Sequence, residues 1–222
     1  MLWGFDISNW QAGINAGDLD CAFVICKATE GTFFVDGCCD AFIQECRRAG
    51  KLWGFYHFAR EYEPETEAEF FFNNTYFYTG QGIPVLDYEV WGSNYDDVAW
   101  CERFITRYHE LTGIWPMIYI SASYAHLFRG SWIPEKCGLW VAGYTDMPSD
   151  YSCPYDVSPW EFPAIWQYTS DAERFGERLD ANIAYMDDFA WGCYAGYNTP
   201  GDSSEPAPDK KFITGRVTIE LD

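Results

Sequence analysis

Basic side chains are scarce in this sequence. Its 222 residues contain 14 Lys and Arg against 34 Asp and Glu, which gives a formal net charge of −20. A protein that binds nucleic acid neutralises phosphates with many Lys and Arg, and a protein that adheres to anionic lipid does the same. We therefore expect neither nucleic acid nor a membrane among the partners.

Long apolar runs are also missing. No segment approaches the roughly 18 consecutive apolar residues that a membrane-spanning helix needs. Residues 1–6 contain neither the basic segment nor the apolar segment of a signal peptide. We expect a chain without a membrane span or an export signal.

Paired metal-binding cysteines are absent as well. The nine Cys include no CxxC pair, so their spacing argues against a zinc site, and we expect no metal and no cofactor. Because nine is an odd number, at least one thiol is unpaired or bonded to another chain. Without an export signal we expect mainly reduced, buried thiols, and one or two disulfides formed after release stay open.

Short apolar strands alternate with helical segments along the chain. Several of the strands are apolar on both faces, which is typical of a parallel sheet or barrel covered by helices, so the predicted fold class is α/β. The predicted strands are Leu2–Ile7, Ala22–Ala28, Leu52–Ala59, Ile83–Val90, Pro116–Ser121, Leu139–Gly143, Ala164–Thr169 and Leu179–Ile183. The predicted helices are Asp40–Ala49, Thr66–Tyr78, Asp96–Leu111, Ser123–Phe128 and Met186–Trp191.

The composition changes after Cys193. Residues 1–193 form the predicted main domain, and residues 194–211, rich in Gly, Pro, Ser and acids, are predicted to be a linker. Residues 212–222 have a β-like pattern but are too few to build a core. This tail therefore either docks on the main domain or begins a further, truncated module.

Two acids interrupt the apolar segment Pro84–Val90, namely Asp87 and Glu89. The side chains of residues i and i+2 of a strand point to the same face, and their Cα atoms are about 6.6 Å apart at about 3.3 Å per residue. Crowding and desolvation should raise the pKa of at least one of them, as a general acid beside a second carboxylate requires. The alternative is a solvated strand end with two ordinary acids.

Further polar residues stand where a parallel barrel would gather them. Asp6, Gln167 and Asp180 lie at or near strand ends, and catalytic groups of α/β barrels occupy the carboxyl ends of strands. With the pair above, this predicts a cluster of four acids. Alternatives are an Asx turn at Asp6, a helix N-cap at Asp180, or a site for a hard cation, although no Asp/Gly-rich metal loop supports the last.

Seven segments, in this order, resemble the glycoside hydrolase family 25 lysozymes, the Chalaropsis type that is common in phage endolysins. The resemblance covers about residues 2–192, and the seven together are far more specific than any one of them. The segments are Gly4-Phe5-Asp6-Ile7-Ser8-x-x-Gln11, Lys27-Ala28-Thr29-Glu30-Gly31, Gly54-Phe55-Tyr56-His57-Phe58-Ala59-Arg60, Pro84-Val85-Leu86-Asp87-Tyr88-Glu89, Ile118-Tyr119-Ile120-Ser121, Leu139-Trp140-Val141-Ala142 and Trp166-Gln167-Tyr168-Thr169.

The resemblance implies an irregular, flattened TIM-like (β/α)5β3 barrel. It also implies a lysozyme that hydrolyses the β-1,4 bond from N-acetylmuramic acid to N-acetylglucosamine in bacterial peptidoglycan. The catalytic residues implied by the family pattern are Glu89 as general acid, Asp87 as its partner carboxylate, and Asp6 and Asp180 as supporting acids. The implied substrate-binding residues are Tyr56, Tyr119, Trp140 and Trp166, and we add Gln167 from its strand-end position. His57, also on such a segment, is expected to be a hydrogen-bonded core residue.

The resemblance favours a route in which the substrate's 2-acetamido oxygen assists, while direct attack by Asp87 and inversion through water stay open. We expect a monomer that acts on glycan strands at the cell wall, made in the host cytoplasm and released through a holin-type lesion. On this interpretation the tail either docks on the main domain or begins a truncated wall-binding module. Two other functions are alternatives, a chitinase-like hydrolase and a non-catalytic wall-binding module. Val85 stands where the chitinase-like pattern needs an acid, and the presence of all four acids disfavours the non-catalytic module.

Overall fold

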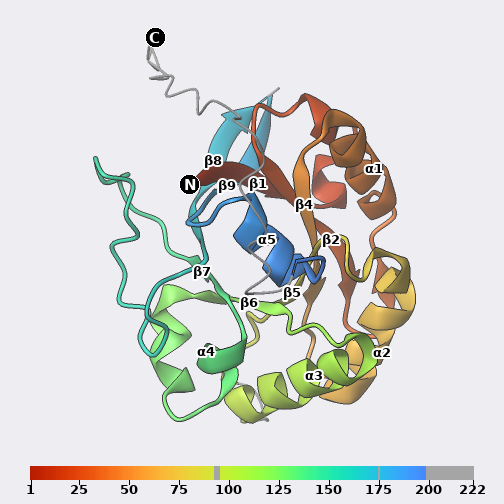
Figure 1. Ribbon diagram of the computed structural model, residues 1–222, viewed down its shortest axis with the longest axis vertical. Coiled ribbons are helices and arrows are strands. Elements are labelled where there is room, and N and C mark those ends of the chain that lie inside the picture. The colour runs from red at the N-terminus through yellow and green to blue at the C-terminus, as the bar shows by residue number, and fades with distance from the viewer. Residues whose placement is uncertain (93–95, 175, 199–222) are drawn as a thin grey trace.

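Eight strands close into a ring in the computed structural model, which describes residues 1–92, 96–174 and 176–198. Figure 1 shows the arrangement of these strands. Neighbouring strands pair in parallel around the ring, except that β9 is antiparallel to both β8 and β1. A short strand β3 (Phe34–Val35) adds to β2 outside the ring. The ring strands are β1 (Leu2–Ile7), β2 (Phe23–Glu30), β4 (Leu52–Phe58), β5 (Ile83–Asp87), β6 (Met117–Ser121), β7 (Leu139–Ala142), β8 (Ile165–Arg174) and β9 (Glu177–Ala184).

This ring confirms the predicted α/β barrel, and every predicted strand is present. One boundary was wrong in a way that concerns the site. The segment Ile83–Val90 does not form one strand, because β5 ends at Asp87. Glu89 therefore lies two residues beyond the strand, and the strand spacing of side chains does not fix its direction. The other large difference is that β8 and β9 form a longer hairpin than predicted.

Helices cover the outside of the ring where the chain crosses between parallel strands. The helix boundaries follow ordinary capping: the Asp96 side chain accepts from Ala99 N at the start of α3, and Gly113, at φ 73°, ends that helix. Residues 76–78, which we predicted as the end of a longer helix, form a separate 3₁₀ turn. Residues 122–128, which include the short helix predicted at 123–128, form a 3₁₀ helix. The helices are α1 (Cys39–Ala49), α2 (Pro64–Thr75), α3 (Asp97–Thr112), α4 (Ile133–Lys136) and α5 (Asp188–Ala195).

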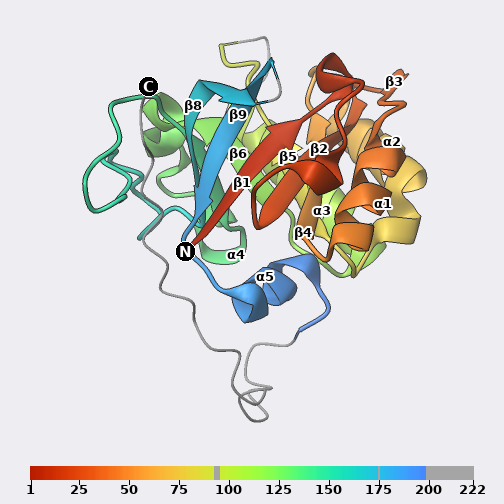
Figure 2. The same ribbon diagram turned by 90° about the horizontal axis from the view of Figure 1, so that it is seen from above.

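An apolar core fills the inside of the ring, and α5 closes one end of it. Figure 2 shows α5 at the end from which β1 starts. Trp191 of α5 is buried and packs on Phe23 of β2, with ring centroids 4.9 Å apart. Burial of such large rings is a major stabilising contribution, on the order of 2 to 3 kcal/mol each. Because this end is plugged, the opposite end, where the parallel strands finish, is the one open to a ligand.

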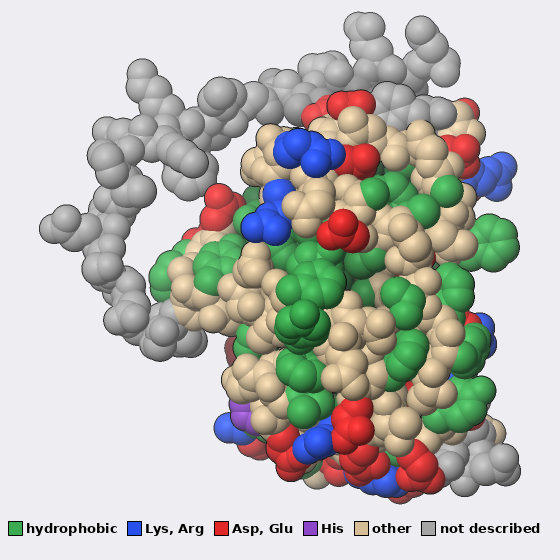
Figure 3. Space-filling view, turned by 90° about the vertical axis from the view of Figure 1, so that its right-hand side faces the viewer, with side chains coloured by type: hydrophobic (Ala, Val, Ile, Leu, Met, Phe, Trp, Pro, Cys, Tyr) green, Lys and Arg blue, Asp and Glu red, His purple; other side chains and the backbone are tan. Residues whose placement is uncertain are grey.

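The surface over α2 and α3 carries ion pairs between the helices. Arg103 of α3 contacts Glu63 and Glu65, and Arg107 contacts Glu69. Figure 3 shows acidic and basic side chains interspersed at the lower end of this face. These pairs are largely exposed, so each stabilises the fold only weakly.

None of the helices in the described part of the chain is long and apolar enough to cross a membrane. The predicted main domain, 1–193, ends inside α5, which continues to Ala195. The predicted linker, 194–211, lies outside the described residues from residue 199 on, and the tail, 212–222, lies entirely outside them.

Candidate active site

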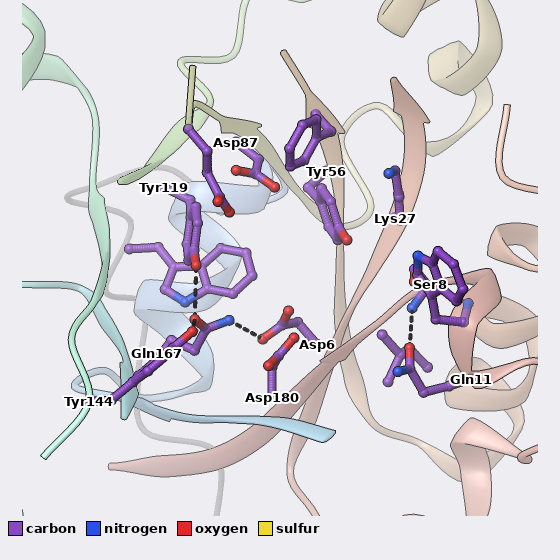
Figure 4. Close-up of a pocket in the computed structure, with 15 residues that line it drawn as sticks. Asp6, Ser8, Gln11, Lys27, Tyr56, Asp87, Tyr119, Tyr144, Gln167 and Asp180 are labelled. Atoms are coloured by element: carbon purple, nitrogen blue, oxygen red, sulfur yellow. Dashed lines mark hydrogen bonds between the residues drawn. The ribbon is translucent and has the colours of Figure 1, made fainter. Parts of the chain in front are cut away.

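A cavity of about 330 Å³ opens at the carboxyl ends of the parallel strands. Each of the eight ring strands contributes at least one side chain to its wall, and the loops that follow them add others. Figure 4 shows these side chains converging on the cavity. Polar and aromatic groups dominate its wall, and four carboxyl groups face it. The lining residues are Asp6, Ile7, Ser8, Trp10, Gln11, Lys27, Tyr56, Phe58, Asp87, Glu89, Tyr119, Trp140, Tyr144, Gln167 and Asp180.

Asp6 is held at the floor of the cavity by two amides. Its Oδ2 accepts from Asn182 Nδ2 at 2.7 Å and from Gln167 Nε2 at 3.0 Å. Asp6 also pairs directly with Asp180 in the β1–β9 register, so the two side chains face each other (Figure 4). Burial raises the pKa of Asp6 well above its ordinary value and the charge of Asp180 adds to the rise, while the two amide hydrogen bonds oppose it.

Asp87 ends β5 on the opposite wall and is almost completely buried. Burial, followed by the charge of Glu89, raises the pKa of Asp87 well above its usual range. Its Oδ1 atom is buried and makes no hydrogen bond within the described residues. An unpaired buried carboxylate oxygen costs free energy, so this atom is a ready acceptor for a donor that a ligand brings.

Glu89 lies at the edge of the cavity with its side chain partly exposed. Burial and then the charge of Asp180 raise the pKa of Glu89, while a hydrogen bond with Asp87 and the positive charges of Lys27 and Arg60 oppose the rise. A carboxyl with a raised pKa that still reaches solvent can hold a proton and exchange it. The arrangement can therefore do acid–base chemistry. Among the described residues, no group of His, Cys, Asp and Glu side chains is arranged to hold a metal ion.

Aromatic side chains form the rest of the wall, and their hydroxyls are oriented. Gln167 Oε1 accepts from both Tyr119 OH and Tyr144 OH at 2.8 Å. Trp140 is buried at the base, where its Nε1 donates to Asn182 Oδ1 at 2.8 Å. The Gln167 amide thus couples two tyrosines to Asp6 in one connected hydrogen-bond network.

Aromatic rings extend the site beyond the cavity. Trp10, on the loop after β1, is 83% exposed although it lines the cavity. On the other side, Trp91 and Tyr124 stack with ring centroids 4.3 Å apart and line a second hollow of about 350 Å³. Glu89 borders both hollows. Flat apolar rings on either side of an acid suit a long ligand with C–H-rich faces, such as a chain of sugars.

Comparison with known proteins identifies the family. A model for glycosyl hydrolases family 25 matches residues 5–176. The chain belongs to glycosyl hydrolases family 25. An N,O-diacetylmuramidase from Chalaropsis sp is 32% identical over 198 residues, covering 78% of this chain and 90% of the relative. Lysozyme M1 from Streptomyces globisporus is 31% identical over 197 residues, covering 81% of this chain and 65% of the relative. The solved structure of a bacterial lysozyme from Streptomyces coelicolor matches with a TM-score of 0.76 at 26% identity, covering 89% of this chain and 98% of that one.

This family 25 hydrolase brings eight of the nine predicted site residues to one cavity. The exception is Trp166, which is fully buried in the outer core and donates from Nε1 to the Gly143 carbonyl. Gln167 faces the ring interior, and the next residue along a strand must face the other way. We therefore do not retain Trp166 among the residues proposed to touch substrate.

Sequence reasoning missed several residues of the family 25 site. Asn182 could have been found, because it is two positions from Asp180 on β9 and so shares its face. Lys27 lies on a family segment, but its role was not assigned. Trp10 and Tyr144 come from a 3₁₀ turn and a loop, where no periodic signal marks their direction.

A second buried network supports the rim of the barrel beside this site. His57 is fully buried, with Thr29 Oγ1 at 2.8 Å from Nδ1 and Glu67 Oε2 at 2.8 Å from Nε2. The Glu67 carboxylate also accepts from the backbone N–H groups of Arg60 and Tyr62. Burial lowers the pKa of His57, and Glu67 opposes this. The expected core role of His57 is confirmed.

Proposed function

We propose that this family 25 hydrolase is an N-acetylmuramidase that cleaves the β-1,4 bond between N-acetylmuramic acid and N-acetylglucosamine in bacterial peptidoglycan. One observation carries the proposal: Glu89, with its raised pKa, stands beside an Asp87 whose buried Oδ1 has no partner among the described residues. The relatives named as muramidase and lysozyme support the same substrate. We infer that the enzyme acts at the cell wall as a monomer.

Glu89 is the proposed general acid. Its raised pKa keeps the carboxyl protonated at a pH where an ordinary Glu has lost its proton. It donates this proton to the glycosidic oxygen as the bond to the anomeric carbon breaks. Positive charge then develops at the sugar ring, and the remaining carboxylates of the cavity stabilise it.

Asp87 is the proposed partner of the substrate's acetamido group. Its Oδ1 accepts the amide N–H, which orients the acetamido oxygen toward the anomeric carbon and stabilises the charge that forms when this oxygen attacks. Glu89, now a carboxylate, removes a proton from the incoming water, which opens the ring intermediate. Two inversions at one carbon give overall retention.

Two other routes predict different observations. Direct attack by Asp87 would leave a glycosyl ester on the enzyme, and attack by water alone would invert the anomeric centre. Proton NMR of the first product distinguishes inversion from retention. Glycan whose muramic acid amines have been deacetylated separates the retaining routes, because substrate assistance requires the acetamido group and direct attack does not.

The proposed substrate fits the shape of the site. Trp10 on one side and the Trp91–Tyr124 stack on the other offer flat faces on both sides of Glu89. Stacking of sugar faces on such rings would supply short-range contacts that long-range charge does not. Such contacts matter here, because a protein of net charge −20 repels a polymer that also carries carboxylates.

The decisive experiment is mass spectrometry of fragments released from purified peptidoglycan. We expect new reducing ends on N-acetylmuramic acid. Glu89→Gln should fold normally and lose at least about a thousandfold in turnover, since it removes the general acid. Glu161→Gln is the matched control, because Glu161 is exposed and does not line either hollow. Near-normal lysis by Glu89→Gln would reject the assignment of the acid.

The other candidate functions are tested by the same material. Cleavage confined to chitin, with peptidoglycan untouched, would support a chitinase-like hydrolase. Binding to peptidoglycan without release of fragments would support a non-catalytic module. The four acids disfavour the non-catalytic module, because a binding site gains nothing from holding carboxyls at raised pKa values.

A further inference from the structure

Two basic residues stand beside the acidic cavity, and one glutamate joins them. Lys27 Nζ lies 2.5 Å from Glu30 Oε2, and Arg60 Nε lies 2.7 Å from Glu30 Oε1. Both cations contact the ring of Phe58, at 4.8 Å and 4.7 Å from its centroid, and Phe58 lines the cavity. We call Lys27, Glu30 and Arg60 the cationic rim, because its formal charge is +1.

The two cations differ in what they can still bind. Lys27 is only 11% exposed and its ammonium contacts Glu30, so it helps to hold Glu30 in place and is little available to a ligand. Arg60 is 46% exposed, and within the described residues only its Nε has a hydrogen-bond acceptor. Its two terminal nitrogens therefore carry free N–H donors. A guanidinium fixed by an aromatic face and an acid presents these donors in a set direction, which suits a planar carboxylate.

The negative charge of the substrate indicates which group the Arg60 donors would bind. Muramic acid carries a lactyl carboxyl, which is either free or joined to a peptide that has carboxylates of its own. The cavity already holds four acids, and Lys27 is the one basic residue among those that line it. A substrate carboxylate placed near the acids would be repelled. The rim at the ends of β2 and β4 is the part of the site that can attract it.

We propose that Arg60 is a specificity-determining residue that binds a carboxylate of the glycan, with Glu30 and Phe58 holding its guanidinium in place. This inference rests on the proposed muramidase function and extends it to the choice of sugar. The carboxylate is either the free lactyl group or that of the attached peptide. An uncharged N-acetylglucosamine polymer offers neither group, so the rim would favour muramic acid over it.

The test compares Arg60→Gln with the unchanged chain on three glycans. The first is intact peptidoglycan, the second is peptidoglycan stripped of its peptides by an amidase, and the third has its carboxyls converted to neutral amides. We expect Arg60→Gln to raise KM about fivefold to tenfold on a carboxylate-bearing glycan, as loss of a half-exposed charge-assisted hydrogen bond implies, with kcat changed less than about twofold. On the neutral glycan the two proteins should share one KM.

The pattern across the glycans identifies the source of the carboxylate. An effect on intact glycan alone assigns the peptide, an effect on stripped glycan alone assigns the lactyl group, and an effect on both assigns either anion. Arg60→Lys, which keeps the charge but loses the planar fork, should recover part of the affinity. Kinetics are taken at each variant's own pH optimum, because the charge of Arg60 opposes the burial that raises the pKa of Glu89.

Arg103→Gln is the matched control, since it makes the same change of net charge on the α2–α3 surface, away from the cavity. An unchanged KM for Arg60→Gln on both carboxylate-bearing glycans would overturn the inference, and so would an equal rise on the neutral glycan. Sedimentation with the three glycans in the Glu89→Gln background repeats the comparison without turnover. Absence of muramic acid reducing ends with the unchanged chain would reject the proposed function separately.

Discussion

The buried carboxylate of Glu67 allows a quantitative test of how the rim of the barrel is held. Glu67 is fully buried and accepts four hydrogen bonds from three groups: His57 Nε2 at 2.8 Å, Arg60 N at 3.1 and 3.2 Å, and Tyr62 N at 2.6 Å. Replacement by Leu keeps a side chain of similar size but removes every acceptor. The three donors then lose their partner at once.

The expected loss follows from these contacts. An orphaned buried donor costs about 1 to 3 kcal/mol, and His57 Nε2 is the most deeply buried of the three. The two backbone donors are only part-buried, so water replaces some of what they lose. We expect Glu67→Leu to lower the free energy of unfolding by about 3 to 5 kcal/mol. Glu67→Gln should lower the free energy of unfolding by only about 1 to 2 kcal/mol. Its amide oxygen can still accept from the backbone N–H groups, and a neutral His57 can change tautomer so that its Nε2 accepts from the new amide N–H.

Urea unfolding at pH 7, followed by tryptophan fluorescence and circular dichroism, measures both variants. The midpoint should fall in the order unchanged chain, Gln, Leu, with the slope of the transition preserved. Glu69→Leu on the same helix is the control, because the Glu69 side chain is about half exposed and makes only a surface ion pair with Arg107. If Glu67→Leu lost less than about 1 kcal/mol, the network would not be what holds the rim, and the reasoning would be refuted.

Three further outcomes are expected. Burial and then the charge of Asp180 raise the pKa of Glu89. Asp180→Asn should therefore lower that pKa and move the alkaline limb of the pH profile of its remaining kcat/KM to lower pH, whereas a shift to higher pH would contradict this cause. Burial and then the charge of Glu89 raise the pKa of Asp87 in the folded state. The contribution of Asp87 to stability is therefore fully present below its unfolded-state pKa near 3.8 and is lost as pH rises through its folded-state pKa. Asp87→Asn should therefore gain stability over the unchanged chain between pH 4 and pH 8 in urea titrations, while a constant difference would count against the raised pKa. Burial raises the pKa of the Cys26 and Cys101 thiols well above 9. A thiol reagent at pH 8 should therefore leave both thiols unmodified in the folded protein and label all nine cysteines in urea. Prompt labelling of either thiol in the native protein would disprove the assigned burial.

Strand alternation accounts for most of what the sequence could predict about the site. Asp6 is the second-to-last residue of β1 and Asp87 is the last residue of β5, and both side chains face the cavity because they point to the inside of the ring. The same rule shows why two neighbours on β8, Trp166 and Gln167, could not both reach substrate. Strand alternation does not apply to Glu89, because β5 ends at Asp87 and the loop that follows sets the direction of the Glu89 side chain.

Loops account for what could not be predicted. Tyr144 enters the cavity from the long connection after β7, and Trp10 projects from a 3₁₀ turn whose Ser8–Gln11 capping box fixes it. No periodic pattern of apolar residues marks such positions, because loop direction depends on tertiary contacts. The pairing of Lys27 with Arg60 through Glu30 joins residues from two strand ends and is likewise visible only once the barrel is closed.

The closure of the ring by β1 and β9 has a consequence for synthesis. Asp6 receives its hydrogen bond from Asn182, 176 positions later in the chain, and from Gln167, 161 positions later. Contacts this distant in sequence form late, because the entropy of closing the loop must be overcome before they contribute. A growing chain still held by the ribosome before residue 182 has emerged contains Asp87 and Glu89 but not the floor that orders Asp6. The complete site therefore cannot form until β8 and β9 have been synthesised, so hydrolytic activity appears later than the two acids Asp87 and Glu89 themselves.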